Sequence, residues 1–326
     1  MANLSTKYMG LELKNPVIIS SCGITETATG VQKCEAAGVG AVVMKSVFEE
    51  QINAEISQAA AESLHGHTEW QDYLTTYVRE ESLKTYLSEM EKAKSSVSIP
   101  VFGSVNCATQ GGWIDFVKRL EATGVDGLEL NMFVVPNDFH QTSEEIEMTY
   151  VEIYKAVASL ISIPVVLKLP PYITTPNRFI RRLSDEGAKG FVLFNRSVPF
   201  DIDIDKQKIA VKNVMSAPQE ISYSLRMVSW LAGQYECQLA ASTGIHNTAA
   251  VIKQLLAGAD VVQLCSTIYK NEFKIITHIV DELNRWLDTK GFESVDDIRG
   301  KLSLKNNTDQ ALYERVQYIK AFTGIK

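Results

Sequence analysis

Residues 123–131 read Thr-Gly-Val-Asp-Gly-Leu-Glu-Leu-Asn, and this stretch contains the unit from which the fold is built. Gly124 suits the left-handed backbone that ends many helices. The run Gly127–Asn131 that follows is short and largely apolar, as expected for one buried strand. The same order of glycine and apolar run recurs elsewhere, with runs that start near Ala41, Gly190 and Asp260. The chain therefore repeats a helix followed by a buried strand.

Eight such apolar runs can be counted along the 326 residues. They cover Pro16–Ser20, Ala41–Lys45, Pro100–Val105, Gly127–Asn131, Pro164–Leu169, Gly190–Phe194, Gln238–Ser242 and Asp260–Leu264. Because these runs are apolar throughout instead of alternating, both faces of each strand should be covered, as in a parallel sheet. Eight such units predict one α/β domain over residues 1–326, a closed (β/α)8 TIM barrel. The alternative is an open doubly wound sheet, but the G-x-G-x-x-G turn typical of such sheets is absent after the first run.

Two connections are longer than ordinary loops, residues 46–80 after the second strand and residues 195–220 after the sixth. Loops of this length inside a compact domain are usually lids or binding segments. The second one contains the alternating stretch Asp201–Asp205, which predicts a short strand and half of a hairpin. A charged, helical tail is expected on the outside of the barrel, ending with residues 304–326.

The composition excludes several classes of partner. The chain has 32 basic and 39 acidic side chains, a net charge of 32 − 39 = −7, and no Lys/Arg-rich block. Nucleic acids and anionic membranes are therefore not expected as partners, and no run approaches the roughly 20 apolar residues of a membrane span. The five cysteines are far apart and odd in number, which indicates reduced thiols in a cytoplasmic protein. They are Cys22, Cys34, Cys107, Cys237 and Cys265.

Polar side chains stand at the carboxyl ends of the predicted strands, the edge at which such barrels hold their reactive groups. Two of them, Lys45 and Lys168, end apolar runs. A desolvated ammonium there is costly unless an anion or a ligand pairs with it. The alternative is a salt bridge with Glu129 or another carboxylate of the barrel. We expect a polar, planar ligand at this edge.

The seventh and eighth runs end in small residues that open helices. Ser242-Thr243-Gly244 precedes a helix expected near Asn247, and Cys265-Ser266 precedes the next one. Free backbone N–H groups at paired helix starts form a phosphate site in this position of a barrel. The sequence therefore predicts a phosphorylated cofactor.

Six segments resemble, in the same order along the chain, the class 1 dihydroorotate dehydrogenases. They are Asn15-Pro16-Val17, Met44-Lys45-Ser46, Leu128-Glu129-Leu130-Asn131 with Pro136-Asn137, Val166-Leu167-Lys168-Leu169-Pro170-Pro171-Tyr172, Thr243-Gly244-Ile245, and Gly258-Ala259-Asp260-Val261-Val262-Gln263-Leu264. The resemblance runs from about residue 3 to residue 303.

The resemblance implies a flavin mononucleotide (FMN) on the barrel, and oxidation of dihydroorotate to orotate, or of a related cyclic substrate, by hydride transfer to flavin N5. That reaction belongs to pyrimidine biosynthesis. Carried over by position, the residues that line the flavin or its phosphate are Ser20, Ser21, Lys45, Ser46, Asn131, Lys168, Asn195, Gly244, Cys265 and Ser266. We also expect a homodimer.

The sequence departs from the family pattern at the catalytic base. The family carries Ser-Cys-Pro-Asn after Glu-Leu-Asn, and its cysteine removes the substrate proton. Here that segment contains Val134 and Val135, which cannot accept a proton. A histidine is the natural substitute near neutral pH, and the candidates are His65, His67 and His140. A solvated surface loop explains the first two equally well.

Other residues are weaker candidates for a role in binding or catalysis. Arg196 is expected to clamp a substrate carboxylate, unless it pairs with an aspartate of the stretch Asp201–Asp205, and Asn137 is placed with it at the substrate. Cys22 and Cys265 are interpreted as small apolar fillers in preference to reactive thiols. The pair His65 and His67 lacks the further ligand that a metal site needs, so no metal is expected.

Three functions follow. The first is the flavin-dependent oxidation, with Lys168 stabilising negative charge as the flavin is reduced. The second is a lyase or isomerase that binds a phosphorylated substrate and uses Lys168 as an amine base or Schiff-base former. The third is a flavin-binding barrel without catalysis. No cysteine spacing of an iron–sulfur site is present in the sequence.

Overall fold

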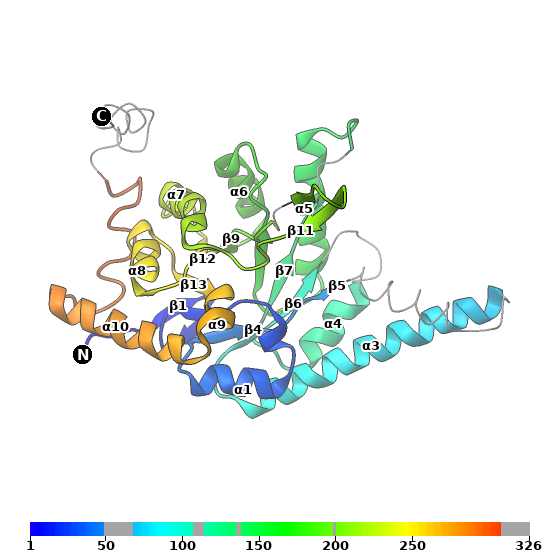
Figure 1. Cartoon of the computed structure of the whole chain (residues 1–326), viewed down its shortest axis with the longest axis horizontal. Helices are drawn as coiled ribbons and strands as arrows, with labels where there is room; N and C mark the ends of the chain where they lie inside the picture. Colours follow the sequence, from blue (N-terminus) through cyan, green and yellow to red (C-terminus); the bar gives the residue numbers. More distant parts are fainter. Residues whose placement is uncertain (49–67, 107–113, 135–137, 198–199, 308–326) are drawn as a thin grey trace.

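A computed structural model describes residues 1–48, 68–106, 114–134, 138–197 and 200–307 (Figure 1). Eight parallel strands form a closed ring. They are β3 (Val17–Ile19), β4 (Ala41–Val43), β6 (Val101–Asn106), β7 (Gly127–Asn131), β8 (Val165–Leu169), β9 (Gly190–Leu193), β12 (Gln238–Ser242) and β13 (Val261–Leu264). The pairing of β4 with β6 and of β13 with β3 closes the ring, so the predicted TIM barrel is confirmed and an open sheet is excluded.

Helices connect the strands and cover the outside of the barrel (Figure 1). They are α1 (Ala28–Ala36), α3 (Thr68–Ser96), α4 (Ile114–Ala122), α5 (Ser143–Ala158), α6 (Pro176–Asp185), α7 (Ile221–Leu231), α8 (Thr248–Ala257), α9 (Ser266–Asn271) and α10 (Lys274–Lys290). Short 3-10 turns, η1 (Gly23–Thr25) and η2 (Pro218–Glu220), precede α1 and α7. The glycine signals mark helix ends as predicted: Gly258 ends α8 with φ +117°, a conformation that favours glycine.

The inside of the barrel changes from apolar to polar along the strands. At the amino-terminal end, a hairpin of β1 (Thr6–Tyr8) and β2 (Leu11–Leu13) closes the opening. A cluster that fills this end contains Tyr8, Leu13, Ile18, Ala41, Val43, Phe102, Val166, Val192, Ala240 and Val261. Side chains two residues further along a strand point to the same face. These positions include Ser20, Ser104, Lys168, Ser242 and Gln263, which are polar and buried. The barrel is therefore plugged at one end and polar at the other.

The first long connection differs from the prediction. Residues 46–80 include strand β5 (Val47–Phe48), which joins β6, and the first part of α3 from Thr68 onward. Among the side chains of α3 that the structure describes, Leu83, Leu87 and Met90 are buried.

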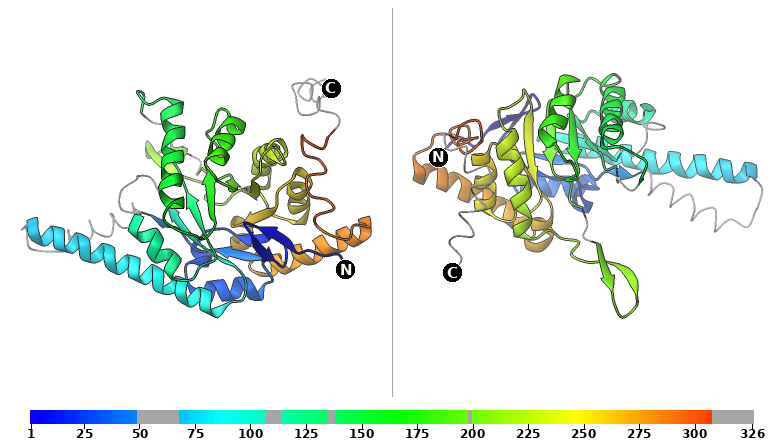
Figure 2. Two further views of the ribbon diagram at one scale, coloured as in Figure 1. Left: turned by 180° about the vertical axis from the view of Figure 1, so that it is seen from behind. Right: turned by 90° about the horizontal axis from the view of Figure 1, so that it is seen from above.

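The second long connection contains the predicted hairpin. Strands β10 (Phe200–Asp203) and β11 (Lys208–Val211) pair antiparallel. The hairpin projects away from the barrel, as the right-hand view of Figure 2 shows.

The C-terminal part of the chain crosses the outside of the barrel through α10. Residues 291–307 follow in turns, with Val295 and Ile298 buried. Most of the tail expected at residues 304–326 lies outside the described residues. Among the described residues no helix is both long and apolar enough to cross a membrane.

Candidate functional site

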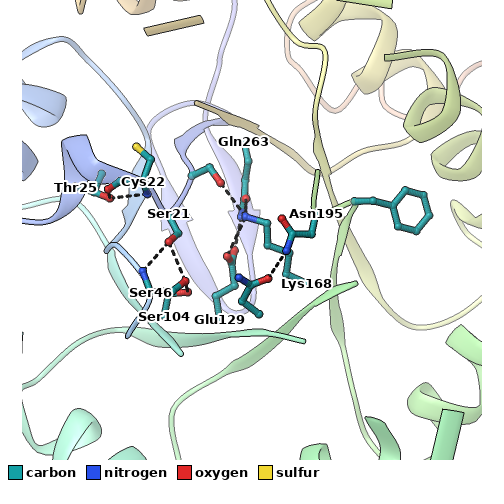
Figure 3. A network of polar contacts seen from close by, with 12 residues as sticks. Ser21, Cys22, Thr25, Ser46, Ser104, Glu129, Lys168, Asn195 and Gln263 are labelled. Carbon is teal, nitrogen blue, oxygen red and sulfur yellow. Dashed lines mark hydrogen bonds and ion pairs between the residues drawn. The ribbon is translucent and has the colours of Figure 1, made fainter. Parts of the chain in front are cut away.

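Lys168 lies at the centre of a buried polar network at the carboxyl end of the barrel (Figure 3). Its Nζ donates to Ser20 Oγ at 2.9 Å, to Glu129 Oε1 at 3.3 Å and to Gln263 Oε1 at 3.4 Å. Gln263 Nε2 in turn donates to the second oxygen of Glu129 at 2.6 Å. An ammonium has three donors, and here all three are used. The salt bridge that the sequence left open as an alternative for Lys168 is therefore present.

Three serines link the ends of neighbouring strands beside this network. The Ser46 N–H donates to Ser21 Oγ at 2.8 Å, and the hydroxyl of Ser46 lies 3.0 Å from that of Ser21 and 2.7 Å from that of Ser104. The hydroxyl of Tyr86, from α3, donates to the backbone oxygen of Ser104 at 2.8 Å. Burial raises the pKa of Tyr86 well above its usual range. The strands β3, β4 and β6 are thus tied together at the mouth of the barrel.

Lys45, the second predicted lysine, is less buried than Lys168. Its Nζ lies 2.6 Å from Glu26 Oε1, in an ion pair that is partly open to solvent. The alternative of a carboxylate partner therefore holds for both lysines, although Glu26 lies outside the barrel strands. Neither lysine needs a ligand to balance its charge.

Two asparagines meet on the opposite side of the mouth. Asn195 Nδ2 donates to Asn131 Oδ1 at 2.7 Å. Within the described ranges, Asn131 Nδ2 and Asn195 Oδ1 have no further partner, so a donor and an acceptor stay available at this edge. A planar ring with alternating donors and acceptors suits such a pair.

A cavity of about 170 Å³ opens beside these residues. Among the residues that line it are Ser20, Ser21, Lys168, Asn195, Gly244, Cys265 and Ser266. Seven of the ten predicted cofactor residues therefore come together around one cavity. Ser46 contacts Ser21, Asn131 contacts Asn195, and Lys45 lies next to Ser46 in the chain.

The cavity wall at the start of α8 fits a phosphate. Gly244 and Ile245 are buried, and their N–H groups donate no hydrogen bond within the part of the chain that the structure describes. Gly244 has φ +77°, and a side chain there would collide with the backbone of Ile221. Buried N–H groups normally have an acceptor. An anion at this point supplies one, so the donor set fits the phosphate of the predicted cofactor.

Ser216 also lines the cavity, and it contacts two residues with which the sequence did not group it, His246 and Lys270. Ser216 Oγ lies 2.9 Å from His246 Nε2, and the backbone N–H of Ser216 donates to Ser266 Oγ at 3.0 Å. Lys270 Nζ donates to the backbone oxygen of Ser216 at 2.6 Å. Burial lowers the pKa of His246, and the nearby Lys270 lowers it further. Because the three residues are distant in sequence, no local motif could have identified them.

Arg196 lines the cavity with a different partner from those predicted. Its Nε donates to Glu220 Oε2 at 2.8 Å and its Nη2 to Glu220 Oε1 at 3.2 Å, while Nη1 donates to the backbone oxygen of Val214 at 2.8 Å. The expected alternative partners in Asp201–Asp205 were wrong, since Asp201 pairs with Lys212. Burial alone would raise the pKa of Glu220, but the hydrogen bonds from Arg196 and from the N–H of Ala217 hold it below its usual range.

Of the three candidate bases, the structure describes only His140. His65, His67 and Asn137 lie outside the described residues. His140 is exposed at the turn before α5, where its N–H donates to Asp138 Oδ1 at 2.9 Å, and it does not line the cavity. Val134 is half-buried, and its N–H donates to the hydroxyl of Tyr150 at 3.0 Å. Across the described residues there is no cluster of three or more potential metal ligands.

Comparison with known proteins assigns the chain to a family. The family model described as dihydroorotate dehydrogenase matches residues 3–287. The catalytic subunit of dihydroorotate dehydrogenase B (NAD(+)) from Methanocaldococcus jannaschii is 25% identical, over 87% of this chain and 93% of its own length. The protein of the same name from Thermoplasma acidophilum is 25% identical over 92% of this chain and 99% of its own. Dihydroorotate dehydrogenase A (fumarate) from Lactobacillus helveticus is 25% identical over 93% of this chain and 99% of its own. The chain belongs to the dihydroorotate dehydrogenase family of oxidoreductases, as its resemblance to the class 1 enzymes predicted.

Proposed function

We propose that this chain is an FMN-dependent oxidoreductase that oxidises dihydroorotate, or a related cyclic substrate, at a CH–CH bond. The observation that carries the proposal is the pair of buried N–H groups of Gly244 and Ile245, which have no partner among the described residues and lie beside the polar network of Lys168. When bound, FMN supplies a hydride acceptor. These residues lie at the end of the barrel where enzymes of this fold act.

The residues divide into two sets by what they offer a flavin. Gly244, Ile245 and Ser266 would hold the phosphate, because small residues let the backbone approach it closely. Asn131 and Asn195 would orient the ring through their free amide groups. Lys168 would place a fixed positive charge beside the ring. Its three hydrogen bonds hold it in position, and a preorganised cation in a water-poor site stabilises developing negative charge.

Proton removal from the substrate is the weak point of this site. Val134 and Val135 stand where the family carries its cysteine base. We propose that His65, His67 or His140 substitutes for it, and that oxidation is slow where none reaches the substrate. General-base catalysis typically contributes about 10² to 10⁴-fold to a rate. A flavin-binding barrel without catalysis stays a second candidate on this observation.

The hydrogen bonds of Lys168 argue against the lyase or isomerase alternative. A lysine that donates to a carboxylate and two further acceptors is an ammonium without a free electron pair. Such a group cannot attack a carbonyl or remove a proton. Binding of FMN distinguishes the oxidoreductase from the lyase or isomerase, which needs no flavin.

A comparison of FMN with riboflavin tests the cofactor proposal. The two molecules share the ring and the ribityl chain, and riboflavin lacks the phosphate. We expect the apoprotein to bind FMN at least tenfold more tightly than riboflavin in a fluorescence-quenching titration. Equal affinities would contradict the proposed phosphate site. If neither compound binds, the proposed flavin cofactor is wrong.

We also propose that the enzyme works in the cytoplasm as a homodimer and that the β10–β11 hairpin joins the two copies. The register places Phe200 opposite Val211 and Ile202 opposite Ile209, on one face of the hairpin. All four side chains are more than half exposed. An isolated two-stranded hairpin is marginally stable in water, so a covered face is expected.

The arrangement of the hairpin favours a second copy as the partner. The charged side chains Asp201 and Asp203 lie on the other face, where Asp201 pairs with Lys212, so the apolar face carries no charge of its own. Two such faces related by a twofold axis cover each other with the same residues, as a symmetric contact requires.

A further inference from the structure

We propose that Cys22 and Cys265 form a redox-active thiol pair, which reacts with low-molecular-weight disulfides and closes into an intramolecular disulfide bond. Both cysteines follow neighbouring strands of the barrel. Cys22 comes after β3 and Cys265 after β13, and these strands pair through Ile19 and Leu264. The N–H of Ser20 donates to the backbone oxygen of Leu264 at 2.9 Å, so the two chain segments are still in contact where the strands end.

The sulfur of Cys22 is surrounded by hydrogen-bond donors. The thiol of Cys265 donates to it. The backbone N–H of Thr25, in the turn η1, donates to the backbone oxygen of Cys22 at 3.0 Å, and the N–H groups of this turn also act on the sulfur. The hydroxyl of Tyr269, from α9, is a further donor to the sulfur. It packs closely against Gly23, the residue after Cys22, and lies 3.0 Å from where a Cβ atom of residue 23 would be. Donors around a sulfur stabilise the thiolate, which is the reactive form of cysteine.

These contacts assign different roles to the two thiols. The hydrogen bond from Cys265, with those from the backbone and Tyr269, lowers the pKa of Cys22 below its usual value, although burial acts in the opposite direction. The pKa of Cys265 is raised, because its proton is held by Cys22 and the residue is buried. Cys22 is therefore the attacking thiol, and Cys265 the one that completes the disulfide.

The other groups near the pair do not compete for this role. Lys168 is the cation that acts on Cys265, and it lowers that pKa only in part. Burial raises the pKa of Tyr269 to about 12, so its hydroxyl stays a donor. Burial also raises the pKa of Cys34 and of Cys237 to about 12 each. Cys237 is partly exposed like Cys22 and serves as a matched control.

The reaction proceeds in two exchanges. The Cys22 thiolate attacks one sulfur of a small disulfide, forms a mixed disulfide and releases one small thiolate. Cys265 then loses its proton to that thiolate and attacks the sulfur of Cys22, which displaces the second small thiolate. Two protein thiols are oxidised, and the small disulfide is reduced to two thiols. The reaction does not depend on the proposed cofactor or substrate.

The sequence alone favoured a packing role for both cysteines, and the structure supplies what that argument lacked. A filler needs neighbours of matching shape, whereas Cys22 has donors directed at its sulfur. Both residues are partly exposed, so a small disulfide has access to the pair. Disulfides in the cytoplasm are commonly transient and redox-sensing.

Alkylation and oxidation with peptide mass spectrometry test the proposal on the folded, full-length protein. We expect the rate of alkylation by iodoacetamide to rise at a clearly lower pH at Cys22 than at Cys237. Oxidised glutathione should then produce a peptide in which Cys22 and Cys265 are linked. A Cys265→Ser variant should stop at a glutathione adduct on Cys22, and Cys237→Ser should behave as the wild type.

Two results would overturn the proposal. One is an alkylation profile of Cys22 that coincides with that of Cys237. The other is the absence of the linked peptide after treatment of wild-type protein whose circular dichroism shows the native fold. Because both readings are taken on the unaltered chain, misfolding of a variant cannot produce either result.

Discussion

Lys168 Nζ lies 3.3 Å from Glu129 Oε1 inside the barrel, with the two side chains only 7% and 1% exposed. The ammonium therefore faces the cavity with a fixed carboxylate beneath it. A buried pair of this kind adds little stability over apolar residues of the same size, but the loss of one partner is expensive. The ion pair therefore holds the positive charge of Lys168 in a fixed position.

The first prediction concerns this pair. Glu129→Gln leaves the ammonium of Lys168 without its counter-charge and should lower the free energy of unfolding by about 3–5 kcal/mol. The double variant Lys168→Met with Glu129→Gln should recover part of this loss, because no buried charge is left unpaired. Urea denaturation of the two variants measures both values. A loss below about 1 kcal/mol for the single variant would mean that the pair is solvated.

The second prediction concerns Arg196, which is held by Glu220. We propose that the substrate carboxylate replaces Glu220 as the partner of Arg196. Arg196→Ala should then raise KM for dihydroorotate by about tenfold or more. The dissociation constant of FMN should stay unchanged. Glu220→Gln is the matched control, since it frees the guanidinium and should not raise KM. A weaker affinity for FMN in Arg196→Ala, with KM unaltered, would assign Arg196 to the cavity wall alone.

The third prediction concerns pH. Burial lowers the pKa of His246 in the folded protein below its value in the unfolded chain. The unfolded chain then binds more protons at mildly acidic pH, so the contribution of His246 to stability is present above about pH 6.5 and is lost as the pH falls below it. His246→Gln should flatten the fall in unfolding free energy between about pH 7.5 and pH 5. An equal fall in unfolding free energy in the wild type and in His246→Gln would contradict this assignment.

The fourth prediction concerns the hairpin. Ile202→Lys puts a charge on its apolar face and should weaken self-association by about thirtyfold or more. Ala210→Lys puts the same charge on the other face, opposite Asp201, and should not weaken it. Light scattering after size-exclusion chromatography distinguishes dimer from monomer. A monomeric wild type, or a dimer that persists in Ile202→Lys, contradicts the proposed contact.

The strand ends show how much the sequence could predict. The barrel follows from repeated glycines and apolar runs, which are local signals, and the same signals place Lys168, Asn195 and Gly244 at one edge. The contact of Arg196 with Glu220 joins the two ends of one long connection, and that of Ser216 with His246 joins separate loops. Such partners depend on the path of the connection in space, which a local sequence pattern does not reveal.

The start of α3 was not predicted either. The sequence assigned residues 46–80 to one long connection, whereas the helix begins within it at Thr68. Its first turns carry tryptophan, tyrosine and threonine residues, which have a lower helix propensity than alanine or leucine. The thiol pair was missed because a cysteine has no sequence signature for the donors that surround it. Those donors are backbone groups of η1 and a tyrosine of α9, which only the fold brings to Cys22.

Anaerobic stopped-flow reduction of the bound flavin by dihydroorotate tests the central claim most directly, namely a family barrel that retains the cofactor site and lacks the usual base. We predict a protein that binds FMN and is reduced about 10² to 10⁴-fold more slowly than an enzyme with an effective base. Replacing a histidine that serves as the substitute, among His65, His67 and His140, with alanine should slow reduction further. Rapid reduction that is unaffected when all three histidines are changed to alanine would contradict the account.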